Sequence, residues 1–202
     1  MAKRLPCLGC HQLNGVGGRV GPDLSTLSRR RSAQYIAAIV DDPQAARPGT
    51  AMPRSQMTPE LRALVLAVLI GTTPDKVPSA RAPLASAGTP AASRLDGAGL
   101  YARYCVACHG SEGRGDGPNV LFLPVRPAVH RDAELMSTRT NDRLFDAVYS
   151  GGYPLGKSVA MPGFGETLSR DEIWSIVRYL RTLCRCRPPA WSTDGEREPG
   201  ER

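Results

Sequence analysis

A five-residue pattern occurs twice in this chain and limits how it can fold more than any other feature does. Cys7, Cys10 and His11 belong to the first copy, Cys-Leu-Gly-Cys-His, and the second copy, Cys-Val-Ala-Cys-His, begins at Cys105. The chain has 202 residues with six cysteines and three histidines, so the two copies use most of both. Repeated chemistry at this separation predicts two small units rather than one large domain.

The spacing C-x-x-C-H is the pattern by which haem is attached covalently to a protein. Two thiols add to the two vinyl groups of one haem, and the histidine that follows is placed to bind the iron. The sequence therefore predicts two haem c groups. Their attachment residues are Cys7, Cys10 and His11 for the first haem and Cys105, Cys108 and His109 for the second.

Other uses of the cysteines stay open at this point. A C-x-x-C pair can be a thioredoxin-like redox motif, but neither copy has a strand-to-helix context and such motifs do not require the histidine. Zinc binding would require the two copies to converge in space, and a disulfide framework would leave the histidines unexplained. Cys184 and Cys186 are too close in sequence to pair comfortably, so we expect a partner contact or inert thiols there.

Each motif is followed by the same series of segments. A glycine-rich loop comes first and contains Gly-Pro, at Pro22 in the first copy and at Pro118 in the second. A helix predicted from its apolar spacing follows, over residues 32–40 and again over residues 141–149. A Met-Pro pair then precedes the last helix of each copy. These pairs begin at Met52 and Met161.

The last helix of each copy carries its own start signal. Thr58 is predicted to cap the first of these helices, with Pro59 at its first position and Gly71 at its end. Ser169 and Glu172 form a capping box at the start of the second. The predicted buried positions are Leu61, Leu64, Val65 and Val68 in the first helix and Ile173, Ile176, Val177 and Leu180 in the second.

This order of segments resembles the class I cytochrome c family, in tandem. The resemblance implies an all-α fold of two domains, each wrapped around one covalently attached haem c. It also implies that the Met-Pro loops supply the sixth iron ligands, Met52 and Met161. The carbonyls of Pro22 and Pro118 would accept a hydrogen bond from the iron-binding imidazoles and so fix their orientation.

Three residues compete with these ligands. Met57 lies close to Met52, but it sits beside a helix cap, so we expect a core or surface methionine. Met136 competes with Met161 but is not followed by proline. His130 would give ligation by two histidines, and we expect it instead to be a surface histidine in an arginine-rich loop.

Composition predicts where the domains divide. The predicted segments are a first domain over residues 1–71, a Pro/Ala-rich linker over 72–93, a second domain over 94–183 and a charged tail over 184–202. The first helix of the family is expected over residues 95–104 of the second domain. Too few residues precede Cys7 for its counterpart. We expect a misplaced gene start, or a neighbouring chain or the second domain covering the first haem.

The resemblance implies transfer of single electrons between redox partners rather than catalysis. The protein would be a carrier or the cytochrome subunit of a larger respiratory or photosynthetic complex. The alternative is a dihaem redox enzyme of the peroxidase or thiosulfate-oxidising type, which needs one iron that is open or not bound by methionine. Haem attachment of this kind implies a periplasmic or otherwise extracytoplasmic location, although no leader sequence is visible.

Charge narrows the class of partner. The net charge is +7, which predicts redox partners with acidic docking surfaces, a membrane-bound complex among them. Apart from residues 29–31 the arginines are scattered, and no basic stretch is interleaved with aromatic residues, so nucleic acid is not expected. The longest apolar run, residues 64–70, is far short of the ~20 residues that span a bilayer, so no transmembrane segment is expected.

Overall fold

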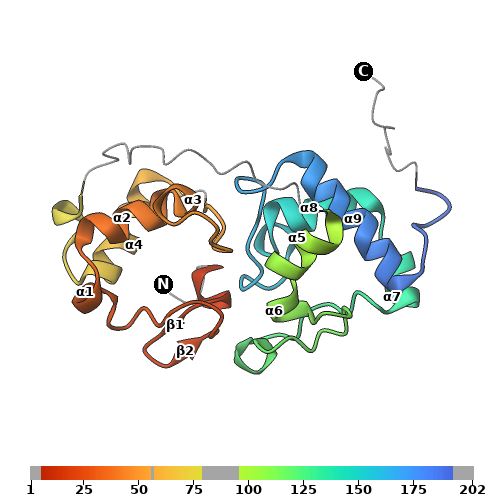
Figure 1. Cartoon of the computed structure of the whole chain (residues 1–202), viewed down its shortest axis with the longest axis horizontal. Helices are drawn as coiled ribbons and strands as arrows, with labels where there is room; N and C mark the ends of the chain where they lie inside the picture. Colours follow the sequence, from red (N-terminus) through yellow and green to blue (C-terminus); the bar gives the residue numbers. More distant parts are fainter. Residues whose placement is uncertain (1–5, 56, 79–95, 193–202) are drawn as a thin grey trace, which may run out of the picture.

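The computed structural model describes residues 6–55, 57–78 and 96–192 (Figure 1). These residues form a first unit over 6–78 and a second unit over 96–192, each mostly helical and each with its own apolar core. Most of the predicted linker, residues 79–93, and of the predicted tail, residues 193–202, lies outside the described residues. Among the helices that are described, none is both long and apolar enough to cross a bilayer.

The first unit starts at the first motif and ends in a long helix. Its elements are, in order, η2 (Pro6–Gly9), β1 (Gln12–Leu13), β2 (Val16–Gly17), α1 (Leu27–Arg30), α2 (Ala33–Asp41), α3 (Pro43–Ala46), α4 (Pro59–Ile70) and η3 (Pro74–Lys76). The short antiparallel hairpin of β1 and β2 was not predicted from the sequence. Asn14 and Gly15 turn it, both with positive φ, as tight hairpins require.

The two longer helices of the first unit start at side-chain caps, of which Thr58 was predicted and is confirmed. The side chain of Ser32 accepts a hydrogen bond from the main-chain N–H of Tyr35 at the start of α2, and Thr58 does the same for Leu61 at the start of α4. Gly71, with φ of 77°, ends α4 in the left-handed region that glycine tolerates. Start and stop signals in the sequence therefore predicted both ends of α4 correctly.

The predicted buried face of α4 is partly wrong. Val65 is buried, but Leu64 and Val68 are exposed, the latter by 61%, and Leu66 and Ala67 are buried instead. Because α4 is apolar on nearly all sides, its spacing alone does not select the face that packs. The core of the first unit is made where α4 meets α2, with Ile36 fully buried.

The second unit is built around two helices that cross. Its elements are α5 (Gly97–Tyr104), α6 (Val106–His109), η4 (Val120–Phe122), α7 (Ala133–Ser137), α8 (Asn141–Ser150), η5 (Tyr153–Leu155) and α9 (Arg170–Cys184). α5 packs against α9 so closely that a Cβ on Gly97 would lie 2.1 Å from the carbonyl oxygen of Ser175. The capping box of Ser169 and Glu172 is confirmed, and the four predicted apolar positions of α9 are all buried.

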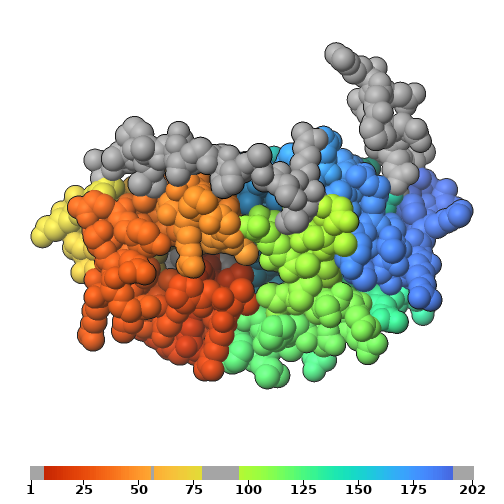
Figure 2. Space-filling view, viewed as in Figure 1, coloured from red at the N-terminus to blue at the C-terminus, as the bar shows by residue number. Residues whose placement is uncertain are grey.

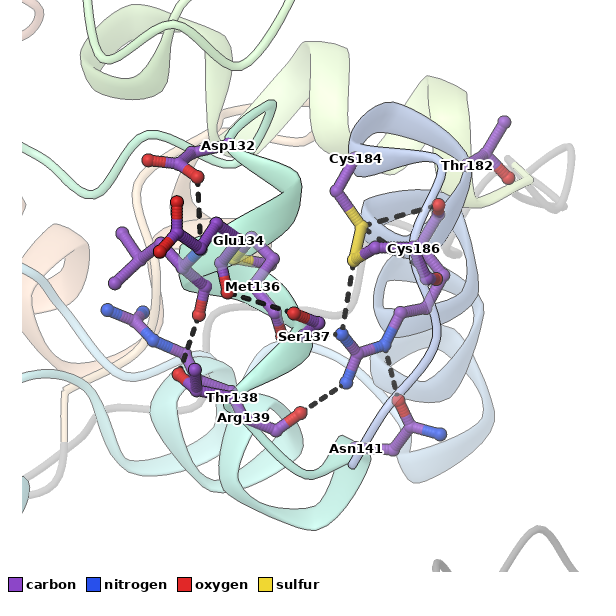
Figure 3. The surroundings of a disulfide bond; sticks show 12 residues. Asp132, Glu134, Met136, Ser137, Thr138, Arg139, Asn141, Thr182, Cys184 and Cys186 are labelled. Atoms are coloured by element: carbon purple, nitrogen blue, oxygen red, sulfur yellow. Dashed lines mark hydrogen bonds between the residues drawn. A yellow bond between two sulfur atoms is a disulfide. The ribbon is translucent and has the colours of Figure 1, made fainter. Parts of the chain in front are cut away.

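The end of α9 differs from the sequence prediction. Cys184 and Cys186 form a disulfide rather than acting as separate thiols (Figure 3). Beside it, the Arg181 guanidinium donates to Asn141 Oδ1 at 2.7 Å and to the carbonyl oxygen of Met136 at 2.8 Å. The left-handed conformation of Arg185, between the two cysteines, turns the chain back so that the two sulfur atoms meet. The pair therefore closes the end of the helix.

Candidate haem-binding site

The first motif is held in a compact turn. Cys7 and Cys10 lie in and directly after η2, and the His11 main-chain N–H donates to the carbonyl oxygen of Cys7 at 2.8 Å. The glycine-rich loop then returns to the motif, because the N–H of Gly21 donates to the carbonyl oxygen of Cys10. A Cβ on Gly21 would lie 2.2 Å from Cε1 of His11, so the loop backbone rests directly on the imidazole.

The imidazole of His11 is oriented by the Gly-Pro pair. Its Nδ1 lies 2.8 Å from the carbonyl oxygen of Pro22. A carbonyl oxygen only accepts hydrogen bonds, so Nδ1 carries the proton and donates. The lone pair of Nε2 is therefore free to bind a metal, which is the arrangement that a carbonyl behind a ligating histidine produces.

The second motif places its residues in a similar way, but through a different carbonyl. Cys105 lies between α5 and α6, and His109 ends α6. Nδ1 of His109 donates to the carbonyl oxygen of Ala128 at 3.0 Å, not to that of Pro118 as the resemblance implied. The main-chain N–H of Gly117 donates to the carbonyl oxygen of Cys108, which keeps Pro118 beside α6. The loop that follows Pro118 brings the carbonyl of Ala128 to the imidazole.

Burial raises the pKa of all four motif cysteines. Burial raises the pKa of Cys10 to about 12, with smaller contributions from Cys108 and Cys7. Burial also raises the pKa of Cys105 to about 12. A thioredoxin-like motif needs a lowered thiol pKa, and all four of these cysteines are free rather than paired. The geometry therefore gives no support to a dithiol redox site.

A zinc centre receives no support from the arrangement either. Within residues 6–55, 57–78 and 96–192, no three histidine, cysteine or acidic side chains are grouped so that they could hold a metal ion. Each motif instead offers two thiols and one imidazole with a free Nε2, the donor set that covalent haem requires. Burial also lowers the pKa of His109, against the opposite effect of its bond to Ala128, so this imidazole is neutral. The residues present fit haem c.

Each predicted methionine ligand sits in a loop tied down by its own unit. The Gln44 amide, on α3, donates to the carbonyl oxygen of Met52 at 2.8 Å. The main-chain N–H of Gly152 donates to the carbonyl oxygen of Met161 at 3.0 Å. Gly151 makes this approach possible, because a Cβ there would lie 2.7 Å from the same carbonyl oxygen. Both methionines are partly buried.

The two methionines that competed as iron ligands pack in or against the apolar cores. Met136 is fully buried in the core of the second unit. Met57 packs against the core of the first unit, beside the cap of α4. Both positions agree with the expectation that these side chains are packing residues, and Met52 and Met161 stay the predicted sixth ligands.

His130 is not the surface residue that the sequence suggested. It is only 9% exposed, and its ring stacks on that of His109 with 4.1 Å between centroids and 15° between planes. The hydroxyl of Tyr101 lies 3.1 Å from Nδ1 of His130. Burial, with His109 and Arg139 nearby, lowers the pKa of His130 well below its usual value, so this ring is neutral too. Its arginine-rich context in the sequence gave no sign of this packing.

The two units meet at the motifs themselves. In the space-filling view the N-terminal segment of the first unit, red, touches the green segment of the second (Figure 2). A Cβ on Gly9 would lie 1.9 Å from the carbonyl oxygen of Ala160, next to Met161. The amide of Asn119 donates to the carbonyl oxygen of Gly9 at 2.5 Å. The first motif therefore lies against both the loop and the methionine segment of the second unit.

Comparisons with known proteins match each motif separately. Residues 4–67 match the family described as cytochrome c, and residues 92–180 match the family described as cytochrome C oxidase, cbb3-type, subunit III. No curated protein matches the chain. Among solved structures, the KustC0563 c-type cytochrome is 26% identical with a TM-score of 0.36, and the match covers 44% of this chain and 98% of that one. The Kuenenia stuttgartiensis reducing HAO-like protein complex Kustc0457/Kustc0458 is 22% identical with a TM-score of 0.37, and the match covers 87% of this chain and 79% of that one.

Proposed function

The chain is a tandem c-type cytochrome, with one cytochrome c domain over residues 4–67 and another over 92–180, and from this we propose that it passes single electrons between redox proteins outside the cytoplasm. It acts as a mobile carrier or as the cytochrome subunit of a larger respiratory or photosynthetic complex. It holds two haem c groups, one attached to each motif. Covalent attachment of this kind takes place outside the cytoplasm in bacteria, which supports the location.

One observation carries the proposal: each domain has two thiols and an oriented histidine in one motif, together with a Met-Pro loop that is bonded within the same domain. When bound, each haem iron supplies a centre that takes up and releases one electron. The thioether of methionine is a soft ligand that favours the ferrous state, so Met52 and Met161 would raise the reduction potentials. A methionine bound at the sixth coordination position of an iron would also keep a substrate from binding there. This donor set supports electron transfer rather than catalysis.

The orienting hydrogen bonds have a part in this function. The carbonyl oxygens of Pro22 and Ala128 accept the Nδ1 protons of His11 and His109, so the Nε2 atom of each ring keeps its lone pair for the iron. A ligand that is held in place moves little when the charge on the metal changes, so less free energy is spent on rearrangement at each electron transfer. The net charge of +7 supports brief docking on acidic surfaces of the redox partners, with an association rate that falls as salt increases.

The test is the absorption spectrum of the exported, haem-loaded and oxidised protein. The weak far-red band that arises from methionine bound to ferric iron is measured per haem, in the wild-type protein and in Met52→Ala and Met161→Ala. A band intensity that corresponds to two methionine-bound haems in the wild type, and to one in each variant, supports an electron-transfer protein in which both irons have a methionine ligand. One band or none in the wild type overturns it and favours the dihaem enzyme, whose iron is open or otherwise bound.

A further inference from the structure

Asn119 contacts the same position of both haem-attachment motifs. In each motif the residue before the second cysteine is small, Gly9 in the first and Ala107 in the second. The main-chain N–H of Asn119 donates to the carbonyl oxygen of Ala107 at 2.9 Å. Its side-chain Nδ2 donates to the carbonyl oxygen of Gly9 at 2.5 Å. One residue of the second domain is thus bonded to equivalent carbonyls in both domains.

The side-chain amide of Asn119 has further hydrogen-bond partners. Oδ1 accepts a hydrogen bond from the main-chain N–H of Arg19 at 2.9 Å, and Nδ2 lies 3.4 Å from Sγ of Cys108. The residue is 2% exposed. A buried amide with all its partners in place holds its neighbours in register, because moving any of them would leave a polar group unpaired.

The backbone of Gly18, in the first domain, lies directly against the Asn119 amide. A Cβ on Gly18 would lie 2.6 Å from Oδ1 and 2.8 Å from Nδ2 of Asn119. The guanidinium of Arg19 lies 4.6 Å from the centre of the Phe122 ring, which adds a cation–π contact at the edge of the same patch. The first domain therefore carries glycine where the amide enters and a cation where η4 of the second domain passes.

We propose that Asn119 is the positioning residue that joins the two haem-attachment motifs into one path for electron transfer between the haems. The inference rests on the proposed function, since it concerns where the electrons go within the molecule. Cys108 Sγ would be bonded directly to the second haem, and the carbonyl of Gly9 is one peptide bond from Cys10, which would be bonded to the first. The Asn119 amide contacts both the Gly9 carbonyl and Cys108 Sγ, and so connects the two attachment sites.

The transfer itself is simple in its balance. With haem bound, one electron would leave a ferrous iron in one domain and reduce a ferric iron in the other, with no bond made or broken and no proton moved. The role of Asn119 is to fix the separation and the contact of the two motifs. An electron taken up at either domain could then leave from the other, which two independent carriers on a tether would not provide.

The test measures electron exchange between the haems in the full, haem-loaded chain after rapid photoreduction by an external dye. Asn119→Asp keeps the size and Oδ1 but replaces the Nδ2 donor with an oxygen that repels the carbonyl of Gly9. Gly18→Ala displaces the same amide from the side of the first domain. Leu121→Ala, at a side chain that is 84% exposed two residues further on, is the control. X-ray scattering of each variant reports whether the domains separate.

The two variants are expected to shift the interface toward an open state by about tenfold to a hundredfold, the effect of losing a hydrogen bond between buried groups. Exchange between the haems slows accordingly, while haem content and reduction by the dye stay as in the wild type and in the control. Unchanged exchange in Asn119→Asp and in Gly18→Ala overturns the inference. Those outcomes leave the proposed function intact; it falls instead if the wild type does not take up and release electrons reversibly.

Discussion

Replacing Gly9 with alanine is expected to open the contact between the domains without touching the chemistry of attachment. The variant motif, Cys-Leu-Ala-Cys-His, would match the second motif at this position, so haem attachment is retained. Gly9 has no positive φ, so alanine causes no backbone strain there. The new Cβ would, however, lie 1.9 Å from the carbonyl oxygen of Ala160, and ordinary contacts begin at 3.4 Å.

The size of the effect follows from these distances. Two backbone segments must move apart by about 1.5 Å, which stretches the 2.5 Å bond between Asn119 and Gly9 beyond the range of a hydrogen bond. Overpacking of this kind costs about 1–3 kcal/mol. A cost of that size should speed hydrogen exchange of the Arg19 amide, which is bonded to Asn119, by about tenfold to a hundredfold.

Hydrogen exchange measured on the reduced protein tests this prediction. Gly15→Ala is the matched control, since a Cβ on Gly15 meets nothing within 4 Å although its φ of 79° strains alanine. The control is expected to destabilise the first domain by about 1–2 kcal/mol without opening the interface. If the Arg19 amide exchanged at the same rate in Gly9→Ala as in the wild type, the close approach of the two backbones would be refuted.

Three further predictions concern the second domain. Met161→Ala should lower the potential of the second haem and let cyanide bind there, because the soft sixth ligand is lost; a redox titration with and without cyanide checks both effects. Arg181→Met should destabilise the protein by about 2–4 kcal/mol in guanidinium unfolding, since it removes charged hydrogen bonds that tie α9 to α7 and to the start of α8, whereas Arg178→Met on the exposed side should change little. Opening the disulfide with Cys184→Ser and Cys186→Ser together should cost about 2 kcal/mol or less, because the closed loop is short, and the same unfolding curves would show it.

Local signals in the sequence were enough to predict the longer helices, but not the short ones such as α1, α3 and α7. Thr58 and Gly71 bound α4, and Ser169 with Glu172 starts α9, because caps satisfy the main-chain groups at helix ends through residues that are close in sequence. The prediction of the haem-attachment residues also depends only on residues that are close in sequence, since C-x-x-C-H spans five positions. The buried positions of α9 were predicted correctly because its polar and apolar faces differ strongly, which is not true of α4.

Contacts between distant segments could not be predicted in this way. The carbonyl behind His109 comes from Ala128, nineteen residues along the chain, and only the folded loop decides this over Pro118. The stacking of His130 on His109 depends on the same loop and on Tyr101 of α5. The role of Asn119 depends on a partner in the other domain. Each of these features lacks a local pattern because its partner lies elsewhere in the chain.

The two domains differ in how they are held together, and this difference links stability to electron transfer. The second domain has its own crossing of α5 on α9, while α4 of the first domain leaves Val68 61% exposed. The first domain instead bonds to the second on both sides of Met52: the Thr50 carbonyl accepts from Arg103 at 3.2 Å, and the Arg54 N–H donates to Thr167 at 2.8 Å. With Asn119 on the first motif, both segments of the first domain that are predicted to carry an iron ligand are also bonded to the second domain. A change at the interface should therefore shift the potential of the first haem more than that of the second.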